Sequence, residues 1–213
     1  MHDLRSPLVT IESMSGLLKE ALGDRLKPEE RVYLQHVEGA ALLMRSLLGD
    51  LTELTLIPTR VADPTPVGLR EVVDQVLLEL GSAIARAKAQ VQVEGELPTV
   101  PGNRVLLQQL LGHLLENAVK FHQHDALPRV VLSSRLLEDA AEISISDNGI
   151  GIPAESRERV FGVFVRLHPR SRFEGNGIGL AVARRCVESH GGRIWLESEP
   201  DQGTTARFTL PLG

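Results

Sequence analysis

Apolar residues within residues 1–57 recur at alternating intervals of four and three positions, the spacing of a helix that buries one stripe against a neighbour. Gly23 interrupts the pattern and Pro28 suits the first turn of a second helix, so the segment predicts a helical hairpin. The stripe positions are Leu4, Leu8, Ile11, Ser15, Leu18 and Leu22 in the first helix and Leu34, Val37, Ala41, Met44, Leu48 and Leu51 in the second.

A lone hairpin cannot cover both of these stripes. Two copies can do so as a four-helix bundle, so the pattern predicts a homodimer. The alternative is that the stripes pack against the C-terminal part of the same chain.

Residues 58–66 show neither the spacing of an amphipathic helix nor the alternation of a strand. They contain Pro58, Pro64 and Pro66, and this density of proline predicts a linker between two domains, residues 1–57 and 67–213.

The remaining chain alternates between the two periods. Helical patterns cover residues 69–88, 103–122, 155–160 and 177–190. Strand patterns cover residues 91–93, 129–137, 141–146, 193–198 and 204–210. Because helices come early and strands cluster late, the fold class is predicted as α+β, with the hairpin followed by an α/β sandwich whose helices cover one face of a mixed sheet.

Composition narrows the function. The 23 Lys and Arg against 28 Asp and Glu give a net charge of −5, which argues against a nucleic-acid partner. The single cysteine, Cys186, excludes an internal disulfide and lies in an apolar helical pattern. No apolar run reaches the length of a membrane span, so a cytoplasmic location is expected.

The stretch from Asp147 to Pro153 follows a predicted strand and must turn. Gly149 and Gly151 allow positive φ and a close approach to a ligand, and Asp147 stands at the strand's end. A buried carboxylate there accepts from the exocyclic amine of adenine, but it would face the carbonyl oxygen of guanine. The stretch therefore predicts a base-selective contact, although a plain turn is the commoner reading of such residues alone.

The helix over residues 103–122 carries four candidate ligand contacts on one face: His113, Asn117, Lys120 and Phe121. An Asn carbonyl oxygen is a suitable Mg²⁺ ligand, and a Lys one turn later supplies a charge for phosphate. The alternative for Asn117 is a solvated helix face.

A glycine-rich stretch, with Gly175, Gly177, Gly179 and Leu180, precedes the last helix and can present bare amides to an anion. The polar segment 166–176 before it, called the lid segment below, is expected to cover bound phosphates and to bring in Arg166 as a second cation. Phe161 and Phe164 are expected to anchor its root in the core.

At the head of the hairpin, His2 points away from the apolar stripe and Asp3 stands beside it. Ser6 lies one turn on, and Pro7 removes the amide that would bond to the Asp3 carbonyl.

Taken together, these residues resemble the transmitter region of sensor histidine kinases, along nearly the full chain. His2 to Leu8 resembles the H box, Leu111 to Phe121 the N box, and Asp147 to Pro153 the G1 box. Phe161 to Arg166 resembles the F box and Gly175 to Leu180 the G2 box, while Gly203, Thr204 and Thr205 resemble the last glycine motif near the adenine. The residues from Phe164 to His168 and from Glu174 to Gly177 are similar to those of phytochrome-like kinases.

The resemblance implies a Bergerat-type ATP-binding fold that uses ATP and Mg²⁺. It implies His2 as phosphoacceptor, Asp3 as its acidic assistant and Asn117 as Mg²⁺ ligand. It also implies Lys120 and Arg166 as phosphate contacts, Asp147 as adenine acceptor and Thr204 near the base. The phosphoryl group would pass to an aspartate of a response-regulator receiver domain, and an upstream sensor domain is absent from this chain.

Two departures from the family pattern keep alternatives open. Ser6 stands where the family has Thr or Asn for dephosphorylating the receiver. It keeps a hydroxyl, so a transmitter that acts mainly as a phosphatase remains the alternative, although the substitution is expected to weaken this activity. His113 stands where many members have Asn. The same position is a water-activating glutamate in the related ATPases, the rival enzyme class, and a non-catalytic docking module is the third reading.

Overall fold

The computed structural model describes residues 2–123 and 125–212, with side chains from residue 6 onward. Two compact units make up the chain, Met1–Leu56 and Ile57–Gly213.

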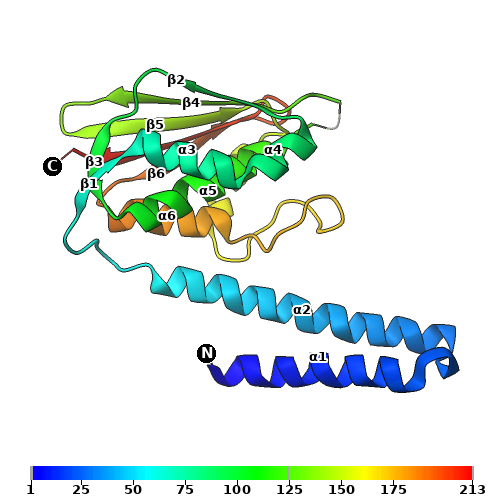
Figure 1. Cartoon of the computed structure of the whole chain (residues 1–213). Helices are drawn as coiled ribbons and strands as arrows, with labels where there is room; N and C mark the ends of the chain where they lie inside the picture. Colours follow the sequence, from blue (N-terminus) through cyan, green and yellow to red (C-terminus); the bar gives the residue numbers. More distant parts are fainter. Residues whose placement is uncertain (1, 124, 213) are drawn as a thin grey trace. The chain divides into compact units, whose positions relative to one another are not determined.

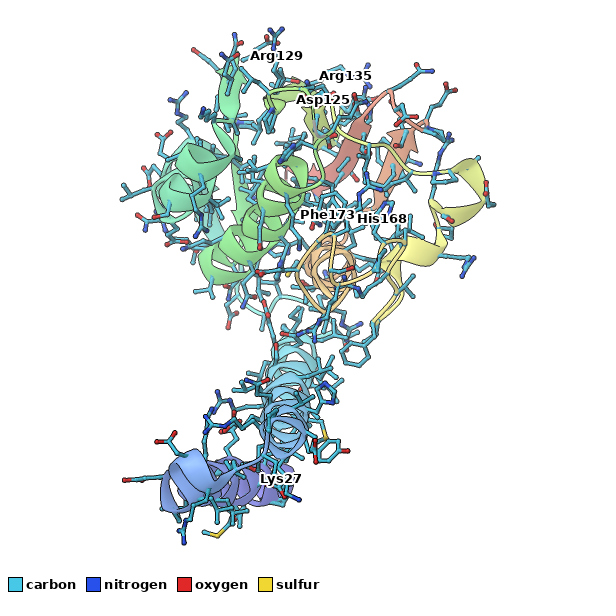
Figure 2. All side chains as sticks on the ribbon, turned by 90° about the vertical axis from the view of Figure 1, so that its right-hand side faces the viewer. Lys27, Asp125, Arg129, Arg135, His168 and Phe173 are labelled. Carbon is cyan, nitrogen blue, oxygen red and sulfur yellow. The ribbon has the colours of Figure 1, made fainter. Side chains whose placement is uncertain are left out.

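The first unit is a helical hairpin. Helix α1 (His2–Leu22) leads through a short 3-10 turn, η1 (Gly23–Arg25), into α2 (Pro28–Leu56). Gly23 has φ +47°, which lets the chain leave the first helix, and Lys27 lies at the turn (Figure 2). Lys19 and Glu38, 3.2 Å apart, and Arg45 and Glu12, 2.7 Å apart, join the two helices. The predicted helical N-terminal region is confirmed.

One copy of the hairpin leaves much of its apolar stripe uncovered. Leu8, Ser15 and Ala41 are buried at 6%, 5% and 1% exposure. Other stripe positions stay open to solvent: Ile11, Leu18, Leu22, Val37 and Met44. The helices therefore carry a wider apolar face than their mutual contact uses.

A five-stranded sheet forms the centre of the second unit. Its order is β2 (Gln90–Glu94), β4 (Arg129–Leu136), β5 (Ala140–Asp147), β7 (Thr204–Pro211) and β6 (Ile194–Ser198). Strands β2 and β4 run parallel, whereas the other neighbours are antiparallel, so the predicted mixed sheet is confirmed.

Helices cover one face of this sheet (Figure 1). They are α3 (Leu69–Glu79), α4 (Gly81–Ala87), α5 (Arg104–Lys120) and α6 (Gly179–Ser189). The fully buried core lies between the layers and includes Leu107, Leu111, Leu115, Leu132, Ile143, Ile145 and Phe208. The opposite face is polar, with hydroxyl pairs such as Ser133 and Ser144, 2.8 Å apart.

Three expectations about local structure are wrong. The helix expected over residues 69–88 breaks at Leu80 (φ −80°, ψ 0°), because Gly81 is a weak helix former. The short helix expected over residues 155–160 is instead two 3-10 turns, η2 (Ala154–Ser156) and η3 (Arg159–Phe161).

The third difference concerns the linker. The end of segment 58–66 belongs to a strand, β1 (Thr65–Gly68), which pairs antiparallel with β3 (Thr99–Gly102). The Val61 amide also donates to the Ser189 carbonyl oxygen at 2.8 Å. Prolines at an edge strand keep the extended conformation without needing an amide partner, which is why the sequence pattern concealed β1.

None of the helices in the described ranges combines the length and the apolar character needed to cross a membrane.

Replacing Leu111, which is 1% exposed, by Ala should lower the free energy of unfolding of the second unit by about 2–5 kcal/mol, because a cavity remains in the core. Leu78→Ala is the matched control, since Leu78 is 76% exposed, and its effect should stay within about 0.5 kcal/mol. Urea unfolding followed by Trp195 fluorescence measures both, because Trp195 is the single tryptophan. Equal effects of the two variants would contradict this description of the core.

Candidate functional site

Helix α5 supplies one wall of the candidate site. Asn103 caps its N-terminus, with a side chain that accepts from the amides of Val105 and Leu106 at 3.0 and 3.2 Å. Its apolar face is buried against the sheet and α6. His113, Asn117 and Lys120 are partly exposed on another face, so the helix holds these candidate side chains in one row.

The loop after β5 is packed against the end of α5. The Ile150 amide donates to the Phe121 carbonyl oxygen at 3.0 Å. A Cβ at Gly149 would lie 2.3 Å from that same oxygen and 2.7 Å from Asp147 Oδ1, so no side chain fits there. Gly149 does not have the positive φ that was expected, whereas Gly151 does, at +68°. Close approach of two backbones, not turn geometry, is the reason for glycine at position 149.

Asp147 is held by the backbone. Its Oδ1 accepts from the Gly149 amide at 2.8 Å and from the Thr204 amide at 3.2 Å. Among the described residues both hydrogen bonds go to this one oxygen, so Oδ2 remains available to a ligand donor.

Burial raises the pKa of the Asp147 carboxyl to about 6, although the two amide hydrogen bonds act in the opposite direction. Desolvation outweighs the hydrogen bonds because the carboxyl group is largely withdrawn from water. A carboxylate that is ionised at neutral pH despite this desolvation is a candidate functional group.

The turn between β6 and β7 closes the site behind Asp147. Gly203 has φ +84°, and a Cβ there would lie 1.9 Å from the Asp147 carbonyl oxygen. Asp147 and Thr204 are direct cross-strand partners. Both residues line a cavity of about 340 Å³, which the described residues of α5 and of the lid segment do not border. Its other lining residues are Ser146, Arg157, Glu197, Ser198, Glu199, Gln202, Gly203 and Thr205.

The lid segment lies against the row on α5. A Cβ at Gly175 would lie 2.9 Å from Lys120 Nζ, and one at Gly179 would lie 3.2 Å from His113 Nδ1. Asn117 lies between these two contacts on the same helix face. The structure therefore brings the glycine-rich stretch and the predicted α5 residues together, and Leu180 follows in the first turn of α6.

Arg166 is engaged with the lid backbone. Its guanidinium donates to the Phe173 carbonyl oxygen at 2.7 Å, to that of His168 at 3.3 Å, and also to that of Gly175. Gly177 packs against it, because a Cβ there would lie 2.8 Å from the Arg166 Cγ. Burial lowers the pKa of Lys120, and the positive charge of Arg166 lowers it further, while Glu116 and Glu174 raise it. Arg166 and Lys120 both lie against Gly175, so the two predicted cations are neighbours.

An aromatic cluster joins the lid to α5. Phe121 and Phe173 have ring centroids 4.9 Å apart, and His168 and Phe173 have theirs 5.5 Å apart. Figure 2 shows His168 and Phe173 side by side. Lys120 Nζ lies 5.0 Å from the centroid of the Phe121 ring. The cluster covers the end of α5 next to the two cations.

The expected anchoring of the lid root is half wrong. Phe161 is buried at 5% exposure and stacks under the guanidinium of Arg184 at 4.0 Å. Phe164 is instead 42% exposed, with φ +62°. The left-handed backbone at this residue turns its ring away from the core.

The phosphoacceptor candidates lie in the first unit. The backbone of His2 and Asp3 is helical, at the start of α1, but their side chains lie outside the described residues. Ser6 is exposed one helical turn later.

Two residues of the site were not predicted. Gln123 Nε2 donates to the Asp201 carbonyl oxygen at 2.8 Å and links the end of α5 to the β6–β7 turn. Ser198 bonds to both the loop after β5 and the β6–β7 turn. A serine at the inward position of β6, in step with Ile194 and Leu196, was the signal that could have found it.

Comparison with known proteins agrees with this geometry. A family model for histidine kinase-, DNA gyrase B-, and HSP90-like ATPases matches residues 102–213. The chain is 34% identical over 212 residues to the phytochrome-like protein Cph1 of Synechocystis sp., a match that covers 100% of this chain and 28% of Cph1. It is 37% identical over 214 residues to the methanogenesis regulatory histidine kinase FilI of Methanothrix harundinacea, which covers 99% of this chain and 24% of FilI.

Full-length ShkA, crystallised in complex with AMPPNP, matches with a TM-score of 0.73 and 25% identity, over 100% of this chain and 44% of ShkA. The chain spans about a quarter of the length of Cph1 and FilI, 28% and 24%. On the family model that matches more than half of its residues, the chain belongs to the histidine kinase-, DNA gyrase B-, and HSP90-like ATPases, and its two units correspond to the transmitter region of a sensor histidine kinase.

Proposed function

We propose that the chain transfers the γ-phosphoryl group of ATP to His2 and then to an aspartate of a response-regulator receiver domain, in the cytoplasm. One observation carries this proposal most directly. Asp147, Lys120, Arg166 and the glycine-rich stretch surround one end of α5, in a chain whose full length matches histidine kinases.

The nucleotide would lie along the exposed face of α5. Its adenine amine would donate to Asp147 Oδ2, and its phosphates would contact Lys120, Arg166 and the amides from Gly177 to Gly179. Arg166 must exchange its lid carbonyl oxygens for phosphate oxygens, so the lid segment reorganises when the nucleotide binds.

The residues present fit Mg²⁺. Asn117 offers a hard carbonyl oxygen between His113 and Lys120, on the side of α5 that faces the glycine-rich stretch. When bound, the ion would neutralise phosphate charge during transfer. This chain's own part is to hold the triphosphate in line and to exclude water with the lid.

The reaction at His2 follows from its neighbour. A ring nitrogen with a lone pair attacks the γ-phosphorus, ADP leaves, and the second ring nitrogen passes its proton to Asp3. Helix α1 sets the spacing of the residues at its start, and Pro7 loosens the turn that carries them.

A second copy of the chain is the partner we expect for the hairpin. The stripe residues Ile11, Leu18, Val37 and Met44 are between 37% and 50% exposed in one copy. Burying them between two copies removes this apolar surface from water, as in a four-helix bundle.

Dephosphorylation of the receiver is the second candidate activity. Ser6 is exposed and lies four residues after His2 on α1, so its hydroxyl shares that helix face and can orient a water molecule. Loss of label from a phosphorylated receiver incubated with the chain, abolished in Ser6→Ala, is the readout that separates this activity from the kinase.

Incubation with ATP labelled at the γ-phosphate should leave acid-labile, base-stable label on the wild type and none on His2→Gln, because a phosphoramidate forms only on the imidazole. His36→Gln is the matched control, since His36 is also exposed on the hairpin, and it should label like the wild type. Label that persists in His2→Gln would end the assignment of the phosphoacceptor. Steady phosphate release without protein label would indicate an ATPase instead.

Asp147→Asn should weaken ATP binding about 10- to 100-fold, because the new amide would direct a donor at the adenine amine. The same change should stabilise the fold at pH 7.5. Removing a carboxylate whose pKa is raised from 3.8 to about 6 relieves up to about 2–3 kcal/mol, at about 1.4 kcal/mol per pKa unit. Calorimetry of binding and thermal unfolding measure the two effects. Asp139→Asn, in the exposed turn before β5, should change neither, and an Asp147→Asn protein that binds ATP normally would contradict the adenine contact.

Nucleotide affinity should also fall in acid. Because burial raises the pKa of Asp147 to about 6, the folded protein takes up a proton between about pH 6 and pH 4 that the unfolded chain takes up only near 3.8. The stability penalty of this group therefore disappears as the pH falls, while the acceptor for adenine is lost. The ratio of wild-type to Asp147→Asn affinity should drop about tenfold from pH 7.5 to pH 5, and taking this ratio cancels the titration of the nucleotide's own phosphates. A ratio independent of pH would show that Asp147 does not contact the base.

A further inference from the structure

The hydroxyl of Ser198 connects three residues next to Asp147, and it has no role in the phosphoryl transfer described above. Ser198 is the last residue of β6 and is buried at 8% exposure. Its Oγ accepts from the Ile152 amide at 2.8 Å, donates to the Gly203 carbonyl oxygen at 2.8 Å, and lies 2.8 Å from Thr204 Oγ1. One side chain thus joins the loop after β5 to the turn before β7.

The chemistry of these partners fixes the direction of every hydrogen bond. A hydroxyl has one proton to donate and two lone pairs to accept with. The Gly203 carbonyl oxygen can only accept, so it receives the Ser198 proton. The Ile152 amide can only donate, so it takes one lone pair. The bond with Thr204 must therefore run from the Thr204 hydroxyl to Ser198.

These directions determine the hydrogen-bonding role of Thr204 toward a ligand. Because the Thr204 hydroxyl donates its proton to Ser198, its oxygen can act only as an acceptor for a ligand. Thr204 is the cross-strand partner of Asp147, and the two side chains lie on the same face and border the same cavity. Asp147 is an acceptor as well, so these two neighbouring side chains both present acceptors to a ligand. An amine is matched there, whereas a carbonyl oxygen is repelled.

We infer that Ser198 is a positioning residue that sets the preference of this site for adenine over guanine, by holding the Thr204 hydroxyl as an acceptor beside Asp147. The inference rests on the proposed function, since it names a determinant of the same nucleotide site. Without the Ser198 hydroxyl, Thr204 can rotate its proton toward the ligand and accommodate the carbonyl oxygen of guanine.

Packing around the junction supports this role. The Asp201 amide donates to the Ile150 carbonyl oxygen at 2.9 Å, and a Cβ at Gly151 would lie 1.9 Å from the Glu199 carbonyl oxygen. The two segments that Ser198 joins are therefore in direct backbone contact. In this setting the Thr204 side chain takes its orientation from Ser198, because the strand pairing already holds its backbone.

The test compares ATP and GTP dissociation constants by calorimetry with the whole chain. Ser198→Ala should lower the ratio of GTP to ATP dissociation constants at least fivefold. Ser198→Thr, which restores a hydroxyl, should keep the wild-type ratio. Thr204→Val, which keeps the shape of the side chain but has no proton to direct, should lower the ratio as Ser198→Ala does, and the double variant should be no worse than either single one.

Ser144→Ala is the matched control. It removes a hydroxyl hydrogen bond of 2.8 Å, to Ser133, from the polar face of the same sheet, and it should leave the ratio unchanged. A folded Ser198→Ala that discriminates as the wild type does would overturn the inference. If Ser198→Ala does not fold, Thr204→Val decides alone, and an unchanged ratio there has the same meaning. A wild type without any preference for ATP would instead refute the adenine contact of the proposed function.

Discussion

The contact between the end of α5 and the loop after β5 is the constraint on which the candidate site depends. The Ile150 amide bonds to the Phe121 carbonyl oxygen, and Gly149 lets the two backbones meet without a side chain between them. This contact places the Gly149 amide on Asp147 Oδ1. The helix that carries the predicted phosphate contacts and the strand that carries the predicted base contact are thereby held in one geometry.

Holding a carboxylate in this place has an electrostatic cost. The raised pKa of Asp147 shows that desolvation exceeds the stabilisation by its two amide partners. In the proposed function a ligand amine supplies the missing partner, so the carboxylate that destabilises the unliganded fold is also the group expected to select a nucleotide with an exocyclic amine. Stability and recognition are opposed at this residue, as is common where a charged group is kept for function.

In the lid segment, by contrast, the charged side chain has its hydrogen-bond partners before any ligand binds. Arg166 satisfies its guanidinium with carbonyl oxygens of its own segment, and Phe173 packs on Phe121. A backbone carbonyl oxygen is a weaker partner for a guanidinium than a phosphate oxygen, so a bound phosphate would compete well for Arg166. In the proposed function, the strand side of the site keeps its hydrogen bonds when the nucleotide binds, whereas the lid side exchanges its own.

Local sequence spacing was enough to predict the helical hairpin, the mixed sheet with helices on one face, and the row of His113, Asn117 and Lys120. These features depend on residues within a few positions of one another, where periodicity and glycine content decide the outcome. Only the tertiary structure decided that Gly149 is required by Phe121, that Phe164 is exposed, that β1 continues the expected linker, and that Ser198 joins Ile152 to Gly203 and Thr204. Those features join segments far apart in the chain, such as Ile152 and Ser198, which are 46 positions apart, and Asp147 and Thr204, which are 57 apart. Local periodicity does not determine which distant segment will pack against a given residue. The hydrogen-bond partners at the site therefore depend on how the sheet packs, which local sequence does not specify.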